Sequence, residues 1–411
     1  MPLARRRWPG ARSGAAIDVQ PHIHYLACKR TIPRARQRAN FQESARNSAS
    51  RIDRPGAEWQ QLLSTGVSPT SLEGFAQQVG HTHLVRLWDI MRGMLPPEPR
   101  PQALPHLWRR GDWRPPLLDA ATLVTAEAAE RRVLLLENPA FAGEYRVAAT
   151  MHAGLQLLAP GETARPHRHS QAALRFVIEG AAAHTSVDGV RQDMQPGDFI
   201  LTPAFSWHEH ANPGTAPMIW LDGLDLPLVR LLGATFAQLS ATEDPFAATA
   251  SASATARFGP GLLPALRIDH AKPSGMVRYP YVEARGALES LRAAGSIDAC
   301  HGCRLHYADP ASGGHAMPTL AAYLQMLPAG FHGERYQSTE AFVHYVVEGS
   351  GSTGIRAIDG AMQSIAWSGG DLFVIPGWLA HRHAAHEDAV LFNLSDAAAQ
   401  QNLGLWRERR A

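Results

Sequence analysis

Residues 166–180 read "PHRHSQAALRFVIEG", and residues 197–203 read "GDFILTP". Each stretch contains a short apolar run that ends at a turn residue, which is the pattern of a β-strand. The neighbouring sequence continues in the same way, with runs such as "RVLLLE", "AGLQLLAP", "AHTSVDG" and "MIWLDGLD". Many short strands at close spacing predict a mainly β domain, folded as a sandwich or a barrel.

The same β-unit occurs a second time near the C-terminus. The stretch "VHYVVEG", residues 343–349, repeats "LRFVIEG", residues 174–180, and "GDLFVIP", residues 370–376, repeats "GDFILTP". A spaced histidine pair begins five residues after each proline: His208 with His210, and His381 with His383. An internal repeat of this kind predicts two β-domains of one fold.

Composition divides the rest of the chain. In residues 1–52, Arg and Lys far outnumber the acidic residues, which predicts a disordered basic tail. A transit peptide, or residues read from a start codon placed too early, would look similar, and we favour the latter. We expect a helical N-terminal region, an N-terminal β-domain, an Ala/Ser/Thr-rich linker with a connecting helix, and a C-terminal β-domain, at residues 53–115, 116–240, 241–300 and 301–411.

Charge and hydropathy exclude several function classes. The 411 residues carry a formal net charge of +2, which predicts binding neither to nucleic acid nor to an anionic membrane surface. No segment has the roughly 18 consecutive apolar residues that span a bilayer, and residues 1–52 lack a secretory signal, so we expect a cytoplasmic protein. Three cysteines cannot form a disulfide framework, and the Cys300-x-x-Cys303 spacing is interpreted as incidental.

Two histidines of the first quoted stretch, His167 and His169, are one residue apart. On a strand such side chains project to the same face about 6.6 Å apart at the backbone, so both imidazoles can contact one ion. The spacing alone is weak evidence for a metal site. It also occurs in two pairs that we interpret as structural or surface residues, His22 with His24 and His81 with His83.

Glycines and a proline at fixed distances from the histidines are more specific. The chain contains the two patterns Gly161-x5-His167-x-His169 and Gly197-x5-Pro203-x4-His208-x3-Asn212. Together they resemble the two signature motifs of the cupin superfamily, whose fold is a small β-barrel with histidines inside. The resemblance implies that His167, His169 and His208 bind one metal ion.

Many cupins add a glutamate ligand that is separated from the second histidine by three or four residues, where this chain has Ala173 and Leu174. Three neutral imidazoles on an octahedral ion leave up to three open positions, which suits Fe(II) enzymes that bind substrate and O2 together. Zinc would also accept three histidines and water, so the ligand set alone does not choose the metal.

The second repeat lacks these ligands. The positions that correspond to His167 and His169 are Tyr336 and Ser338. Without those partners, His381 and His383 are interpreted as structural or surface histidines, and the second metal site as degenerate.

Three longer stretches, "HRHSQAALRFVIEG", "TPAFSWHEHAN" and "IWLDGLDLPLV", resemble the gentisate 1,2-dioxygenase family, which includes salicylate and 1-hydroxy-2-naphthoate dioxygenases. The resemblance extends from about residue 67 to the C-terminus. It implies a mainly β bicupin, with two double-stranded β-helix (jelly-roll) barrels after a helical N-terminal region. It also implies a homotetramer that uses Fe(II) in the N-terminal barrel to open an aromatic ring with O2.

Arg175 lies six residues after His169, on the strand that leaves the ligand pair. An arginine that faces into the barrel would be costly unless it meets an anion, such as a substrate carboxylate. The alternative is a surface arginine paired with Glu179.

The remaining site residues follow from the resemblance. It implies that Arg131 is a second carboxylate clamp and that Gln156, His210 and Asp222 lie at catalytic positions. Relatives tend to carry Tyr or Trp two residues before Gly154, where this chain has His152. A smaller polar ring at this substrate-binding position could change which substituted salicylate fits.

The leading expectation is an Fe(II)-dependent dioxygenase that converts gentisate (2,5-dihydroxybenzoate) to maleylpyruvate. Cleavage of salicylate or 1-hydroxy-2-naphthoate is the nearest alternative. A non-catalytic bicupin that binds a small molecule, and a zinc or nickel cupin isomerase that works without O2, are less favoured.

Overall fold

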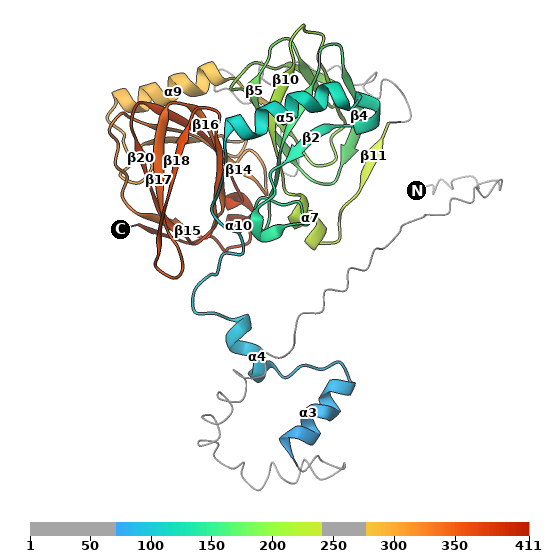
Figure 1. The fold of residues 1–411 in the computed structure, drawn as a ribbon, viewed down its shortest axis with the longest axis vertical. Helices are drawn as coiled ribbons and strands as arrows, with labels where there is room; N and C mark the ends of the chain where they lie inside the picture. The colour runs from blue at the N-terminus through green and yellow to red at the C-terminus, as the bar shows by residue number, and fades with distance from the viewer. Residues whose placement is uncertain (1–70, 241–276, 411) are drawn as a thin grey trace, which may run out of the picture. The chain divides into compact units, whose positions relative to one another are not determined.

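The computed structural model describes residues 71–240 and 277–410 (Figure 1). The predicted basic tail and most of the Ala/Ser/Thr-rich linker lie outside the described residues. The chain divides into two compact units, residues 1–91 and 92–411. None of the helices in the described ranges is both long enough and apolar enough to cross a lipid bilayer.

In the first unit, the helical patterns noted in the sequence form helices. The helix α3 (Leu72–His81) is capped by Ser71, whose hydroxyl accepts a hydrogen bond from the backbone N–H of Gly74 at 3.0 Å. The helix α4 (Leu87–Met94) follows, and its Trp88 stacks on Phe75 with ring centroids 6.4 Å apart.

The N-terminal barrel consists of two antiparallel sheets. Buried and exposed side chains do not alternate along all of its strands. In β3 (His152–Leu158) and β10 (Met218–Leu224), nearly every residue is buried, because these strands are covered on both faces. The six-stranded sheet runs in the order β12 (Arg278–Tyr279), β8 (Phe199–Thr202), β5 (Ala173–Glu179), β10 (Met218–Leu224), β3 (His152–Leu158) and β2 (Arg132–Leu135). The five-stranded sheet runs in the order β11 (Ala237–Leu239), β4 (Thr163–His169), β9 (His208–Ala211), β6 (His184–Val187) and β7 (Val190–Asp193).

The C-terminal barrel repeats this arrangement, which confirms the mainly β, two-barrel fold that the internal repeat predicts. Its six-stranded sheet runs in the order β1 (His106–Trp108), β19 (Leu372–Ile375), β16 (Phe342–Glu348), β21 (Ala389–Ser395), β14 (Ala321–Leu327) and β13 (Cys303–His306). Its five-stranded sheet runs in the order β18 (Met362–Ser368), β17 (Ser350–Arg356), β20 (Ala380–Ala385), β15 (Tyr336–Ser338) and β22 (Glu408–Arg410).

Each barrel receives an edge strand from the chain that leads into the other barrel. The strand β1 precedes the N-terminal barrel but pairs with β19, and β12 precedes the C-terminal barrel but pairs with β8. A helix follows each exchanged strand, α5 (Arg110–Leu123) after β1 and α9 (Tyr281–Ala293) after β12. The sequence prediction placed no strand in residues 53–115, and it put a domain boundary at residue 115, which lies inside α5.

The two six-stranded sheets share one hydrophobic core. Phe176 of β5 stacks on Phe392 of β21 with ring centroids 4.2 Å apart, and both side chains are fully buried. This shared core fixes the two barrels against each other. The remaining short elements are α6 (Ala126–Ala129), the 3-10 turn η1 (Pro139–Phe141), α7 (Leu226–Leu231) and α10 (Ala397–Asn402).

Candidate metal centre and active site

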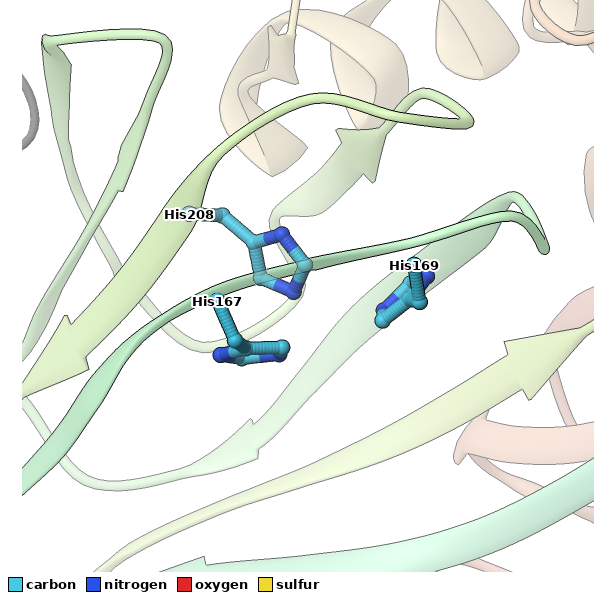
Figure 2. Close-up of side chains that lie close together, drawn as sticks. All are labelled: His167, His169 and His208. Carbon is cyan, nitrogen blue, oxygen red and sulfur yellow. The ribbon is translucent and has the colours of Figure 1, made fainter. Parts of the chain in front are cut away.

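Three buried histidines converge inside the N-terminal barrel (Figure 2). His167 and His169 lie on β4 and, separated by one residue, project to the same face of that strand. The neighbouring strand β9 begins at His208, directly opposite His167 in the antiparallel register. One nitrogen of each ring lies within 4.8 Å of the others, so a single metal ion between the rings could be bound by all three.

Backbone carbonyl groups orient each of these rings. The Nδ1 atoms of His167, His169 and His208 lie 2.9, 2.7 and 3.0 Å from backbone oxygens of residues 165, 171 and 206. Each Nδ1 therefore carries the proton, which leaves Nε2 as the free donor. In the described part of the chain, Nε2 of His208 is buried without a hydrogen-bond partner, as expected for an atom that binds a metal.

Burial keeps these imidazoles neutral. It lowers the pKa of His167 to about 3, with a further contribution from the charge of Arg131. Burial likewise lowers the pKa of His169 to about 4, and that of His208 well below its usual value. Neutral imidazole is the form that binds metals, so no proton has to leave at neutral pH before an ion binds.

No carboxylate from residues 71–240 or 277–410 joins the three histidines. Ala173 and Leu174, at the positions where many cupins have a fourth ligand, are buried apolar residues at the start of β5. Among the described residues, no second group of histidines, cysteines or carboxylates is arranged to hold an ion. Three neutral nitrogen donors fit Fe(II) with open positions, and they also fit zinc.

A buried ion pair lies on the neighbouring strands. Arg175 of β5 is opposite Asp222 of β10, and Nε of Arg175 lies 3.3 Å from Oδ1 of Asp222. The guanidinium also donates a hydrogen bond to the hydroxyl of Thr202 on β8. The alternative pairing of Arg175 with Glu179 is wrong, because Glu179 accepts hydrogen bonds from Arg110 and Arg114 instead.

The pKa of Asp222 is raised towards neutral pH. Burial raises its pKa to about 6, although the charges of Arg175 and Arg131 oppose this rise. Arg131 itself lies in the loop before β2, and burial of its guanidinium lowers its pKa. The residue as a whole is exposed, and its charge contributes to the lowered pKa of His169.

His210 and Gln156 line the same barrel interior. His210 is buried two residues after His208, its ring centroid is 5.7 Å from that of His208, and burial lowers its pKa well below the usual value. Neither of its ring nitrogens has a hydrogen-bond partner among the described residues. Gln156, also buried, lies on β3 opposite Trp220 of β10.

His152 and Gly154 lie at the open end of β3. The half-buried His152 lines a cavity of about 390 Å³ together with Tyr145 and Arg230. A Cβ atom at Gly154 would lie 2.7 Å from Cγ1 of Val133, so this position has no room for a larger residue. Most of the site residues that the sequence predicts therefore lie in or next to the N-terminal barrel interior. They are His167, His169, His208, His210, Arg131, Arg175, Gln156 and Asp222. His152 and Gly154 lie at the edge of this region.

Sequence reasoning missed two residues of this region. Thr202, the last residue of β8, bonds the guanidinium of Arg175, and Val133 of β2 restricts the space beside Gly154. A signal for Thr202 was available, because it is the single polar residue in the apolar run "FILTP". Val133 gave none, since an apolar residue in a strand is the ordinary case.

Known proteins are similar to this chain in sequence and in fold. The model of the cupin domain matches residues 154–224. A gentisate 1,2-dioxygenase of Aquipseudomonas alcaligenes is 43% identical over 327 residues, which is 80% of this chain and 93% of that protein. A 1-hydroxy-2-naphthoate 1,2-dioxygenase of a Nocardioides strain is 32% identical and covers 82% of this chain and 87% of its own length.

A solved structure agrees at the level of the fold. The salicylate 1,2-dioxygenase of Pseudoaminobacter salicylatoxidans, crystallised with gentisate, superposes with a TM-score of 0.76 at 30% identity. The match covers 85% of this chain and 96% of that one. On these similarities, and on the three-histidine site within a two-barrel fold, the chain belongs to the gentisate 1,2-dioxygenase family.

Proposed function

We propose that this protein opens the aromatic ring of gentisate with O2 to give maleylpyruvate, using Fe(II) held by His167, His169 and His208. The observation that carries the proposal is the convergence of these three buried, neutral imidazoles, with no carboxylate ligand, beside the buried Arg175–Asp222 pair. Iron supplies the place where an ortho-hydroxybenzoate and O2 meet and exchange electrons.

The arginines account for recognition of an acid. The charge of Arg131 contributes to the lowered pKa of His167, and Arg131 has no carboxylate within ion-pair distance among the described residues, which leaves it free to bind the carboxylate of the substrate. Arg175 is fixed by Asp222 and Thr202 and adds positive charge to the same space. Arg131 and Arg175 together carry two positive charges, whereas Asp222 supplies one negative charge. The remaining positive charge favours a ligand with one negative charge.

The polar side chains of His210, Asp222 and Gln156 account for binding of the substrate's hydroxyl groups. His210 is neutral and has both ring nitrogens without a partner in the described structure, so it can form a hydrogen bond with a phenolic hydroxyl. Asp222, with a pKa of about 6, stabilises the positive charge that forms on a neighbouring group. The amide of Gln156 orients the ring by donating or accepting a hydrogen bond.

Salicylate and 1-hydroxy-2-naphthoate are the second candidate substrates. Support comes from relatives that are named for such acids, including a 5-aminosalicylate 1,2-dioxygenase of Comamonas that is 33% identical over 83% of this chain. His152, half-buried beside the cavity at the end of β3, is the residue whose size would limit the fused ring of the naphthoate. We further propose a cytoplasmic homotetramer, as the family resemblance implies.

Oxygen uptake by the Fe(II)-loaded protein tests the proposal. We expect uptake with gentisate, with slower turnover of salicylate, which lacks the second hydroxyl that assists electron release. His167→Ala should abolish uptake, whereas His386→Ala, which changes an exposed histidine of the second barrel, should not. Iron-loaded protein that consumes no oxygen with gentisate, salicylate or 1-hydroxy-2-naphthoate would contradict the proposal and favour a non-catalytic binding protein.

A further inference from the structure

A pocket lined by arginines lies on the second barrel, outside the metal site. It has a volume of about 510 Å³ and is lined by five arginines and a single carboxylate residue, Glu98. Its volume is within the range of small-molecule sites. The five arginines are Arg100, Arg335, Arg356, Arg409 and Arg410.

Only some of this positive charge is neutralised. Arg409 donates to Glu98 at 2.9 Å, and Arg410 donates to Asp298 at 2.8 Å. The side chains of the other three arginines form no hydrogen bond or ion pair with the residues that the structure describes. Several positive charges around one pocket raise the local electrostatic potential, and this potential attracts an anion of opposite charge.

The floor of the pocket is the outer face of the five-stranded sheet. Arg356 of β17 lies opposite Ala380 of β20, and β15 pairs with β20 in the register that places Gln337 beside Ala380. On its other side, Gln337 lies opposite Arg409 of β22. Residues directly opposite each other share a face of the sheet, so Arg356 and Arg409 form two walls with the small Ala380 between them.

The rim of the pocket is held in place by Trp378. Its indole N–H donates to Glu98 at 3.2 Å, and the guanidinium of Arg409 lies 4.8 Å from the centre of its ring. Trp378 also has a φ of 64°, a left-handed conformation that is uncommon for a bulky residue. Arg409 therefore has a fixed position at one wall rather than a free surface rotamer.

The first barrel provides an internal comparison, because its equivalent face is filled. Trp207 comes directly before His208 in the first barrel, as Ala380 comes directly before His381 in the second. Val187 lies opposite His208 as Ile355 lies opposite His381, so Asp188 is equivalent to Arg356. The guanidinium of Arg168 stacks on Trp207 at 4.8 Å and donates to Gln238 at 2.7 Å. The same position in the fold thus carries an indole and a carboxylate in one barrel, and a hollow with arginine walls in the other.

We propose that this arginine pocket binds a small oxyanion with at least two phosphate or carboxylate groups. Guanidinium groups match such groups by paired N–H bonds. Three arginines that have no partner among the described residues also exceed the charge that a monoanion would balance. The pocket shares no residue with the metal site, so this inference does not depend on the proposed dioxygenase activity.

Calorimetric titration of the full-length protein with pyrophosphate, and separately with citrate, tests the inference. We expect at least one probe to bind at one site per chain and to bind more weakly as salt rises. Binding of pyrophosphate alone identifies a phosphate ligand, and binding of citrate alone a carboxylate ligand. Arg356→Gln should weaken binding by about tenfold or more, through loss of charge-assisted hydrogen bonds.

Ala380→Trp introduces the residue that the first barrel has at the equivalent position, Trp207. We therefore expect the second barrel to fold and the indole to fill the pocket, so that the anion no longer binds. Arg191→Gln, which removes an exposed arginine of the first barrel, serves as the control and should bind like the unaltered protein. The inference is overturned if neither probe binds, or if Arg356→Gln and Ala380→Trp bind as the unaltered protein does. A change in subunit number in Ala380→Trp, with no anion binding by the unaltered protein, would identify the pocket instead as a contact between copies of the chain.

Discussion

Arg175 and Asp222 are both more than nine-tenths buried and depend on each other for charge balance. Removing one member of such a pair leaves the other as an uncompensated buried charge. Arg175→Gln should therefore lower the free energy of unfolding of the metal-free protein by about 3–5 kcal/mol, as measured by urea denaturation. A loss below about 1 kcal/mol would mean that Asp222 is already neutral or solvated, and the pair would not be part of the site as described.

The lack of space at Gly154 gives a prediction with an internal rescue. Gly154→Ala would bring a methyl group to within contact of Val133, whose Cγ1 lies 2.7 Å from the position of the new atom. We expect a loss of about 1–3 kcal/mol in stability and a higher KM for the substrate. The double variant Gly154→Ala, Val133→Ala should recover most of both, and equal defects in the single and double variants would contradict the steric explanation.

At the scale of single residues, the sequence was sufficient to identify the three histidines that converge, and not the residues around them. The spacing of His167, His169 and His208 with the flanking glycines is local, and the barrel brings the three together as expected. The contacts of Thr202 and Val133 are not local, since they depend on which strand lies next to β5 and β3.

At the scale of elements, two aspartates hold the exchanged strands. The buried Asp198 accepts hydrogen bonds from Nε of Arg278 at 2.8 Å and from the backbone N–H groups of Tyr281 and Gln195, both at 3.0 Å. Asp371 accepts from the backbone N–H of Arg110 at 2.9 Å in the equivalent place. The start of α9 and the start of α5 are thus attached to the barrel that receives the exchanged strand.

Asp198→Ala should detach the segment around β12. Buried donors that lose a charged partner cost about 1.5–3 kcal/mol for each hydrogen bond, so we expect a loss of at least about 3 kcal/mol in the free energy of unfolding. Amide exchange should rise first at residues 278–281. Asp193→Ala, at an exposed carboxylate of β7, is the matched control and should stay within about 0.5 kcal/mol. A change in Asp198→Ala as small as in the control would exclude this role.

The exchanged strands could not be predicted from sequence. The strands β1 and β12 have three and two residues, too few for any periodicity, and they form because each finds an open sheet edge in the other barrel. The helix α5 contains Pro115 and Pro116, residues that ordinarily predict a break, so its extent is not predictable from the sequence either. The longer strands were predictable because their apolar runs occur twice in the same order.

At the scale of the whole molecule, the second barrel contains histidines that are buried without a metal site. Burial lowers the pKa of His344 to about 3 and that of His381 to about 4. The unfolded chain binds protons at these residues below a pKa of about 6.5, while the folded chain does not. Their contribution to stability is therefore complete above about pH 6.5 and is lost as the pH falls.

This linkage predicts acid sensitivity that the metal cannot explain. Each of the two histidines should cost about 2 kcal/mol of stability between pH 7 and pH 5, from 1.36 kcal/mol per pKa unit. Urea denaturation at both pH values measures the loss, and His381→Gln should remove about half of the part that these two residues contribute. The same pH dependence in His381→Gln as in the unaltered protein would show that His381 is not buried in its neutral form.

The central claim is that the three-histidine site of the first barrel directs both atoms of O2 into gentisate. Mass spectrometry of the product formed under oxygen-18 gas tests it most directly, with Fe(II)-loaded protein and with His208→Ala as the comparison. We expect maleylpyruvate with two labelled oxygen atoms, one O2 consumed for each gentisate, and no product from His208→Ala. Product with one labelled atom or none, or unchanged turnover by His208→Ala, would contradict it.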